Sequence, residues 1–262
     1  MNLFDAHCHL QDARLSKDRA GVLSRARAVG VNRIAIKGAS EADWSEVELL
    51  VKSDSFLYPS FGLHPWFLKQ RSSDWAMRLN VLLEKYPQAG VGEIGIDPEP
   101  KGYQAESMEV QEEIFLAQLE IAKRLKRPVS IHCRHTWGHL LELLDRAGPL
   151  PDGWMIHCFG GSKEMAQELL NRGAYLSFSG TITRSTNRKA AEVLPCVPAE
   201  RLLLETDAPD LMPVGAETSV NEPRNLPLIL ARAAFLRGES EAYVASVTYQ
   251  NACRLFAEIC KS

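Results

Sequence analysis

The sequence lacks the features that mark membrane proteins, disulfide-rich scaffolds and strongly basic nucleic-acid binders. None of its apolar runs approaches the roughly 20 residues that a membrane-spanning helix needs. The first predicted strand begins at Asn2, so no secretory leader is expected. The 262 residues carry a formal net charge of -3, which excludes a global cationic field that would collect nucleic acid. We therefore expect a cytoplasmic protein with no membrane contact and no obligate protein partner.

Cysteine is scarce, and its six copies contain no C-x-x-C pair, so a disulfide framework is not expected. Cys8, Cys133 and Cys158 each directly follow a histidine at the end of an apolar run. Because neighbouring side chains of a strand point to opposite faces, these cysteines are predicted to point away from the histidines. Reduced core residues are the favoured interpretation, and a thiolate metal ligand is the alternative.

The sequence is rich in short apolar runs that alternate with amphipathic stretches. The apolar runs predict eight strands, at 2–8, 32–37, 57–63, 89–94, 128–132, 154–158, 174–179 and 201–205. The amphipathic stretches predict nine helices, at 18–29, 41–53, 74–86, 107–126, 136–147, 162–172, 186–194, 223–236 and 240–260. Eight strand–helix units without a break in composition favour a parallel sheet that is buried on both faces.

Two parallel architectures fit this alternation. An open doubly wound sheet usually carries a glycine-rich phosphate turn after its first strand, but here that position holds His-Cys-His-Leu. Eight strands at this length fit a closed (β/α)₈ TIM-type barrel better. We predict a single barrel domain over residues 1–262 with an extra C-terminal helix. In such barrels the functional groups lie at the C-terminal ends of the strands.

Six residues of metal-binding type stand near the ends of the predicted strands. A lone histidine at such a position is usually a hydrogen-bonded structural residue. Six acidic and imidazole groups at one barrel mouth must be paired or coordinated, so together they predict bound cations. The predicted ligands are His7, His9, Glu93, His132, His157 and Asp207.

The first predicted ion is held by residues from the first and last strands. His7 and His9 are two residues apart, so both imidazoles leave the same face of the first strand. Asp207 follows the last strand, which closes the barrel beside the first. Glu93 approaches from the opposite side, and its two oxygens suit it to bridge two ions.

The second predicted ion is held by Glu93 together with His132 and His157, which end adjacent strands. Two ions roughly 3.5–4 Å apart can hold a hydroxide between them and polarise a substrate oxygen. Asp207 could take the proton from that water as a general base. Four imidazoles and two carboxylates suit zinc or manganese by ligand type, while magnesium depends on cellular supply. The predicted cofactors are thus two divalent ions: zinc, manganese or magnesium.

The chain resembles the TatD family of metal-dependent deoxyribonucleases, within the wider amidohydrolase-like barrel superfamily. The resemblance rests on motifs that follow the family order over nearly the whole chain. These motifs are Asp-Ala-His-Cys-His at 5–9, Gly-Leu-His-Pro-Trp at 62–66, Gly-Glu-Ile-Gly-Ile-Asp at 92–97, Gln-Leu-Glu-Ile-Ala at 118–122, Pro-Val-Ser-Ile-His-Cys-Arg at 128–134, His-Cys-Phe-Gly-Gly-Ser at 157–162, Glu-Thr-Asp-Ala-Pro at 205–209 and Asn-Glu-Pro-Arg-Asn at 221–225.

The resemblance implies divalent metals on the six ligands and hydrolysis of phosphodiester bonds in DNA. It implies catalytic roles for Asp207, Glu93 and His64, and a phosphate-facing role for His64 and Arg134. For Arg134, a salt bridge to a carboxylate at the barrel mouth is an equal alternative. Asp5 and Glu205 are predicted to lie below the ligands and orient their imidazoles.

The predicted substrate loops depart from the family pattern. These departures lie at 98–103, which follows Asp97, and at 135–139, which follows Arg134. Segment 207–222 is the longest irregular stretch and should lie over the site as a substrate-shaping loop. The basic side chains after the seventh strand are expected to form a solvated helix face: Arg184, Arg188 and Lys189.

Two enzymatic functions follow from this site. The favoured hypothesis is a deoxyribonuclease that cleaves single-stranded or frayed DNA ends through a hydroxide activated by two metals. The alternative is a two-metal hydrolase of a small ester, amide or phosphoester, because the fold does not determine the substrate. Related barrels often carry a carboxylated lysine where this chain has Glu93, which favours the nuclease. A non-catalytic metal-binding protein is disfavoured because all predicted ligands are present.

Overall fold

Eight strands form one parallel sheet in the computed structural model, which describes residues 1–99 and 105–257. Each strand pairs with the next in chain order. The strands are β1 (Leu3–Cys8), β2 (Val31–Lys37), β3 (Leu57–Phe61), β4 (Gly90–Ile96), β5 (Val129–Cys133), β6 (Trp154–Ile156), β7 (Tyr175–Phe178) and β8 (Leu202–Leu204).

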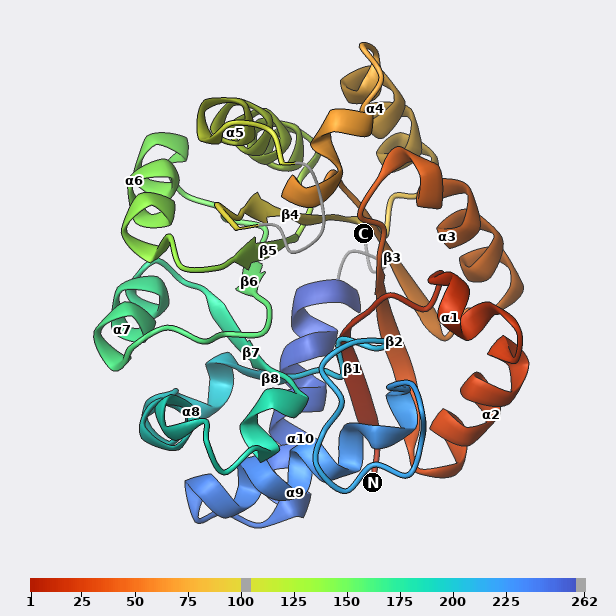
Figure 1. The fold of residues 1–262 in the computed structure, drawn as a ribbon, viewed down its shortest axis with the longest axis vertical. Helices are drawn as coiled ribbons and strands as arrows, with labels where there is room; N and C mark the ends of the chain where they lie inside the picture. The colour runs from red at the N-terminus through yellow and green to blue at the C-terminus, as the bar shows by residue number, and fades with distance from the viewer. Residues whose placement is uncertain (100–104, 258–262) are drawn as a thin grey trace.

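The sheet closes between its first strand and the segment that follows its last strand. The amide of Asp207 donates to the carbonyl of His7 (2.9 Å), and the amide of His9 donates to the carbonyl of Ala208 (2.7 Å). Figure 1 shows the resulting ring of strands inside a ring of helices. The predicted (β/α)₈ TIM-type barrel is therefore confirmed.

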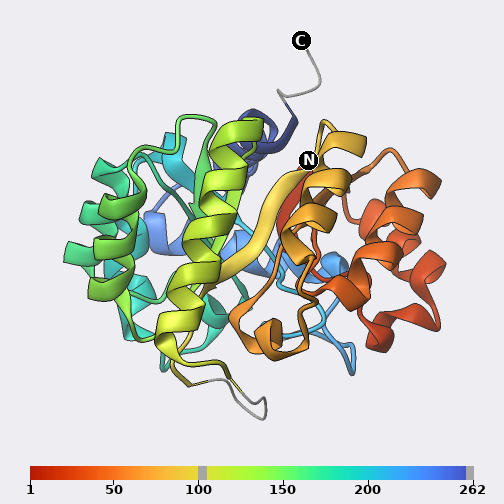
Figure 2. The same cartoon turned by 90° about the horizontal axis from the view of Figure 1, so that it is seen from above.

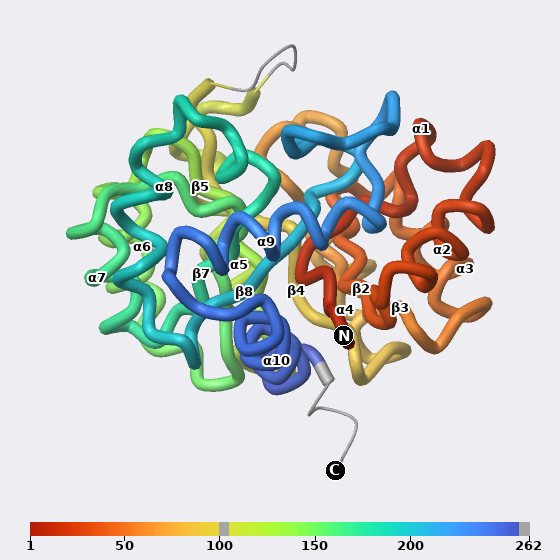
Figure 3. The backbone as a smooth tube through the Cα atoms, turned by 90° about the horizontal axis from the view of Figure 1, so that it is seen from below, coloured from red at the N-terminus to blue at the C-terminus, as the bar shows by residue number. Residues whose placement is uncertain are grey.

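Helices surround the sheet and cover its outer face (Figures 1 and 3). They are α1 (Ala13–Ser16), α2 (Arg19–Ala28), α3 (Glu41–Ser53), α4 (Trp75–Lys85), α5 (Met108–Leu125), α6 (Trp137–Ala147), α7 (Lys163–Asn171), α8 (Arg188–Val193), α9 (Leu226–Arg237) and α10 (Glu241–Ala252). The helix predicted at 240–260 ends at Ala252 and continues as a π-helical turn over Cys253–Ala257. Its last predicted residues, 258–260, lie outside the described residues.

The longest helix, α5, has clear sequence signals at both ends. The hydroxyl of Ser107 accepts from the amide of Val110 (3.4 Å) and caps the N-terminus. At the C-terminus, Lys126 takes a left-handed conformation with φ 55°. The apolar face of the helix packs into the core through residues that include Ile114, Phe115, Leu119 and Ala122.

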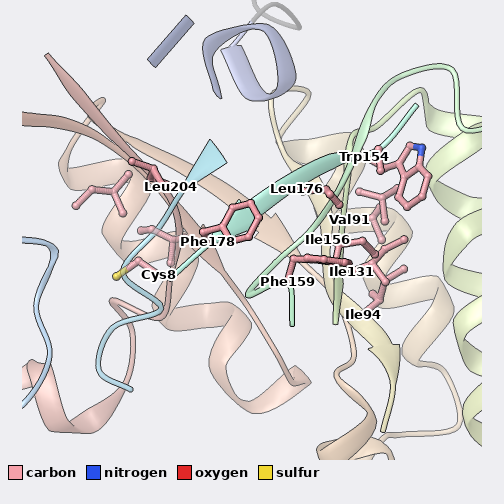
Figure 4. Packing of buried hydrophobic residues seen from close by; sticks show 14 of the residues in the cluster. Cys8, Val91, Ile94, Ile131, Trp154, Ile156, Phe159, Leu176, Phe178 and Leu204 are labelled. Atoms are coloured by element: carbon pink, nitrogen blue, oxygen red, sulfur yellow. The ribbon is translucent and has the colours of Figure 1, made fainter. Parts of the chain in front are cut away.

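Most of the core lies between the strands and the surrounding helices. Figure 4 shows Cys8 and Trp154 within this layer, together with aliphatic residues of several strands. Cys8 and Cys133 belong to the layer, which confirms their predicted place. Cys158 is different, because it is partly exposed, has φ 44° and contacts the Ser179 hydroxyl (3.2 Å).

Several short helical segments were not predicted from the sequence, among them α1 and the 3₁₀ segments Pro65–Gln70 and Gly180–Thr183. Each begins within a few residues of the C-terminal end of a strand, on the side of the barrel where the predicted ligands lie. Figure 2 shows the N-terminus at the opposite end from segment 207–222.

Within the described part of the chain, none of the helices has the length and apolar character needed to span a bilayer.

Candidate metal centre

The six predicted ligands converge at one end of the barrel. His7 and His132 lie within β1 and β5, and His157 is the first residue after β6. Glu93 lies in the middle of β4 and not at its end, where the sequence pattern placed it. Asp207 is three residues past β8, and its φ of 54° turns the backbone back towards β1. The side chain of Glu93 extends from β4 into the barrel and contacts the four imidazoles of the other strands.

The first group of ligand atoms comes from β1, the segment after β8, and Glu93. The Nε2 atoms of His7 and His9 lie 3.2 Å apart. Glu93 Oε2 lies 3.3 and 3.2 Å from these two nitrogens. Asp207 Oδ1 lies 3.6 Å from each nitrogen. Two nitrogens bound to one tetrahedral ion at about 2.0–2.1 Å would lie about 3.3 Å apart, so this spacing fits a single ion.

The second group uses the other oxygen of Glu93. His132 Nδ1 and His157 Nε2 lie 3.1 Å apart. Glu93 Oε1 is 3.2 Å from the first nitrogen and 2.8 Å from the second. Each Glu93 oxygen therefore faces two of the predicted ligand imidazoles, and its bridging of two ions stays a prediction.

Hydrogen bonds behind His9 and His132, and a nearby carboxylate behind His157, favour the nitrogen that faces the centre. His9 Nδ1 is 2.9 Å from the carbonyl of Lys37, and His132 Nε2 is 3.1 Å from Asp97 Oδ2. His157 Nδ1 lies 3.5 Å from Glu205 Oε1. A ring nitrogen that donates to such an acceptor leaves the other nitrogen unprotonated for a cation. These partners thus prepare both imidazole pairs for metal binding.

The facing nitrogens give the strongest structural evidence for cations. A neutral His9 that donates from Nδ1 to Lys37 aims the lone pair of Nε2 at His7 Nε2 across 3.2 Å, and a neutral His132 that donates from Nε2 to Asp97 aims that of Nδ1 at His157 Nε2 across 3.1 Å. Buried groups of this kind need protons or metal ions between them. Nitrogen and carboxylate oxygen are also the ligand types that zinc and manganese accept. The residues present therefore fit the implied divalent ions.

His64 contacts the same carboxylate but differs in its protonation. It is buried, and its Nε2 lies 3.3 Å from Glu93 Oε1. Its Nδ1 accepts a hydrogen bond from the amide of Trp66 (3.1 Å), so a neutral ring carries its proton on Nε2. Although His64, Glu93 and His132 are close enough to hold an ion, a protonated Nε2 is a donor and not a ligand. The Nε2–H of His64 is directed at Glu93 Oε1, and the phosphate-facing role of His64 stays a prediction.

Arg134 lies at the mouth, where its guanidinium is held by the start of the loop after β4. Its Nη1 donates to the carbonyl of Glu99 (3.0 Å), and its Nη2 lies 3.7 Å from the Glu99 carboxylate. This contact is the salt bridge that was given as the alternative to a phosphate-facing role for Arg134. Much of the departing segment 98–103 lies outside the described residues.

Glu93 is the electrostatic centre of the cluster. Burial alone would raise the pKa of Glu93, but the surrounding imidazoles outweigh burial and hold this pKa well below its usual range. The strongest contributions are those of His157, His64 and His7. Glu93 is thus charged, as a bridging ligand must be.

The charge of Glu93 in turn acts on its neighbours. Burial would lower the pKa of His9, but the hydrogen bond and charge of Glu93 raise it to about 9. Burial raises the pKa of Asp207 to about 7, against the lowering charges of His157 and His9. Protons therefore take the place of cations in this cluster, and a metal ion must displace them.

Two buried charged residues near the ligands were not singled out from the sequence. Lys37 is fully buried in β2, with Nζ 3.3 Å from Ser60 Oγ and 4.0 Å from the centre of the Phe256 ring. Burial lowers the pKa of Lys37 to about 7 despite nearby carboxylates. Asp97 accepts from Trp66 Nε1 (2.8 Å) as well as facing His132. The motif that contains Asp97 was recognised, but its role depends on contacts across two loops.

Asp5 and Glu205 lie where the sequence placed them, below the ligands. Glu205 accepts the amide of Cys158 (2.6 Å) and faces His157, which agrees with an orienting role. Asp5 instead accepts from the amide and hydroxyl of Thr206, at 2.9 and 2.5 Å. Asp5 therefore holds β1 against the segment after β8, which leads to Asp207.

Fold and site together define a metal-dependent hydrolase of the amidohydrolase-like barrel type. The model of the family described as TatD related DNase matches residues 4–257 of this chain. The chain belongs to the TatD family.

Relatives with known structure or name agree with this assignment. The chain is 34% identical to the 3'-5' ssDNA/RNA exonuclease TatD of Shigella flexneri, covering 97% of this chain and 98% of the relative. It is 31% identical, with the same coverage of both chains, to the uncharacterized metal-dependent hydrolase YabD of Bacillus subtilis. The crystal structure of YjjV, a TatD homologue from Escherichia coli K12, has 32% identity and a TM-score of 0.89, with 97% of each chain covered.

Proposed function

We propose that this hydrolase is a nuclease that cleaves phosphodiester bonds at single-stranded or frayed DNA ends. The observation that carries the proposal is the position of Glu93, whose two oxygens each face a separate pair of imidazoles. Bridged ion pairs are typical of enzymes that displace groups at phosphorus. A relative with 34% identity is named as an exonuclease of single-stranded DNA and RNA, which supports the same substrate class.

Each side chain of the centre has a role that follows from its contacts. Bound ions would activate a water for attack and offset the charge of the phosphate. Asp207 would accept the proton of that water, and the contact of its carboxylate with the His7 and His9 pair supports this role. His64 would donate its Nε2–H to a phosphate oxygen in place of Glu93 Oε1, which lies 3.3 Å away. Arg134 would contribute its guanidinium after exchanging its contact with Glu99 for the phosphate.

The net charge of -3 supports an end-directed enzyme over a tight binder of duplex DNA. Affinity for a duplex grows with the number of phosphates that basic side chains neutralise. A chain of net negative charge can still hold a few nucleotides through ions and a few arginines. Single strands and frayed ends offer such short, accessible segments.

The proposal is tested by offering the purified protein end-labelled single-stranded DNA, duplex DNA and a panel of small esters and phosphodiesters. We expect divalent ions to support cleavage of the single strand and Glu93→Gln to abolish it. Glu112→Gln, which changes a carboxylate on the outer helix α5, serves as the matched control and should cleave normally. Turnover of small esters with intact DNA would contradict the proposal and favour the alternative small-molecule hydrolase.

A further inference from the structure

Three buried serines lie in the barrel interior below the metal centre and form the serine layer: Ser60 of β3, Ser130 of β5 and Ser177 of β7. The pairing registers, together with the stagger of barrel strands, place the three at one height, since alternate strands contribute the residues of one layer. The strand neighbours of Ser130 and Ser177 belong to the core between strands and helices. Both serine side chains therefore face the inside of the barrel.

An apolar cluster closes the barrel below the serine layer. Met155 and Leu203 stand two residues before His157 and Glu205 on their strands, and they belong to the same buried cluster as Phe256. Bulky aliphatic side chains usually fill all layers of such a barrel. Here a layer of hydroxyl groups separates the apolar cluster from the metal ligands.

Five buried polar atoms around this layer have no hydrogen-bond partner within residues 1–99 and 105–257. They are the hydroxyl oxygens of Ser130 and Ser177, the Nδ1 atoms of His7 and His157, and Oε2 of Glu205. Buried polar atoms of native proteins nearly always bond to another protein group or to an ordered water. The five atoms together therefore indicate a small polar ligand inside the barrel.

The spacing of the upper three groups fits a bridging water. A ring nitrogen of His7, a ring nitrogen of His157 and a carboxylate oxygen of Glu205 lie within 4.8 Å of one another. His157 Nδ1 is 3.5 Å from Glu205 Oε1, which is too long for a strong hydrogen bond. Two atoms that share one water at about 2.8 Å each stand about 4.5 Å apart. One water between Glu205 and an imidazole therefore matches these distances.

Further donors and acceptors border the same part of the interior. β7 lies between β6, which leads to His157, and β8, which leads to Glu205, so Ser177 stands between these two residues and one level below them (Figure 1). Lys37 Nζ contacts Ser60 Oγ (3.3 Å), and an amine or ammonium has further N–H groups to donate. A buried water needs two to four polar partners, and this layer offers them.

We propose that the serine layer binds water, and that this water bridges Glu205 to His7 and orients the imidazole of His7 towards the metals. Ser177 is then a positioning residue of the metal centre. The bridge would give His7 the kind of partner that Asp97 gives to His132. The inference goes beyond the proposed nuclease function, because it concerns the metal centre and is independent of the substrate.

A high-resolution crystal structure of the unmodified protein tests the water directly. We expect an ordered water within about 2.6–3.2 Å of both Glu205 Oε2 and His7 Nδ1, with the Ser177 hydroxyl as a further partner. An interior without ordered water, or a water that contacts neither of these two atoms, would overturn the proposal.

Variants of matched size test the positioning role. Ser177→Val and Ser177→Thr have side chains of the same shape, but only threonine keeps a hydroxyl. We expect Ser177→Val to weaken zinc affinity about tenfold, measured against a competing chelator, and Ser177→Thr to retain the affinity. Ser177→Ala removes the hydroxyl without adding volume, so it should show a loss in the same direction even if the valine variant does not fold.

The outcomes separate this inference from the proposed function. Equal zinc affinity in the alanine variant and the unmodified protein, or an equal loss in the valine and threonine variants, would refute the positioning role of Ser177. Neither the crystal structure nor the zinc titration uses nucleic acid. A protein that fails to cleave DNA but shows the bridging water and the predicted affinities would refute the nuclease proposal and retain the water site.

Discussion

Asp97 is the residue that most directly controls the orientation of a ligand. It accepts from Trp66 Nε1 and lies 3.1 Å from His132 Nε2, so the Nδ1 atom of His132 is left for the centre. The His132 contact and other hydrogen bonds lower the pKa of Asp97 to about 2 against the effect of burial. Asp97 is therefore charged across the range in which the enzyme would work.

We predict that Asp97→Ala weakens metal affinity by about 10–100-fold, as is typical when the partner behind a ligand imidazole is removed. Calorimetric titration of metal against a competing chelator measures the change. Asp97→Asn keeps an oxygen acceptor for the imidazole and should recover part of the loss. If Asp97→Ala binds metal as tightly as the unmodified protein, the orienting role is wrong.

His64 and His132 both touch Glu93 Oε1 but should respond differently to substitution. His64→Ala removes a donor to the substrate phosphate, so we expect slower cleavage with the full complement of metal. His132→Ala removes a ligand, so we expect loss of both metal and cleavage. Elemental analysis of the purified variants distinguishes the two results. Loss of metal from His64→Ala would instead make His64 a ligand.

The meeting of the candidate ligands was largely predictable from the sequence, whereas their supporting contacts were not. Residue type and strand position predicted that His7, His9 and Glu93 would lie together, without any contact information. The burial of Lys37 could not be predicted, because a single lysine in an apolar run usually extends its ammonium group to solvent. Its burial against Ser60 and the Phe256 ring depends on the closed barrel and the C-terminal turn.

At the scale of elements, segment 207–222 links the metal centre to α9, and the buried side chain of Asn221 contacts both of its ends. Asn221 Nδ2 donates to the carbonyls of Thr206 (2.9 Å) and Asp210 (2.6 Å). Its Oδ1 accepts from the amide of Glu222 (3.0 Å) and from Asn225 Nδ2 (2.9 Å). This amide therefore helps to hold the two ends of the segment that carries Asp207.

We predict that Asn221→Ala destabilises the protein by about 1–3 kcal/mol, because the buried carbonyls lose their donor. Denaturant unfolding measures the loss, and hydrogen exchange should increase within 207–222 more than elsewhere. Asn32→Ala, which removes an exposed hydrogen bond to Asn2, is the control and should have little effect. Uniform exchange across the chain would show that Asn221 does not act on this segment.

The long elements were predictable from periodicity, and the short ones were not. The pattern over 107–126 predicted α5 to within one residue at each end, since its apolar stripe repeats over several turns. The segment α1 has four residues, too few for a period to appear. Strand β4 extends to Ile96, past the predicted end at 94, because its pairing with β5 continues through Ile96 and Cys133.

At the scale of the whole molecule, barrel closure brings the ligands together. His7 and Asp207 are 200 positions apart in sequence, yet the amide of Asp207 donates to the carbonyl of His7. The count of strand–helix units predicted this closure, and the ligand positions then predicted a common site. Side-chain direction within the mouth, such as the tie between Arg134 and Glu99, required the structure. That direction depends on loops whose sequence carries no periodic signal.

The central claim is that two ions bridged by Glu93 cleave the DNA strand, and a metal titration of activity tests it most directly. Metal-free protein receives increasing equivalents of manganese or zinc while cleavage of an end-labelled single strand is followed. We predict that cleavage reaches its maximum at two equivalents per chain and that Glu93→Gln shows none at any point. Full cleavage at one equivalent, cleavage without metal, or an active Glu93→Gln would contradict the account.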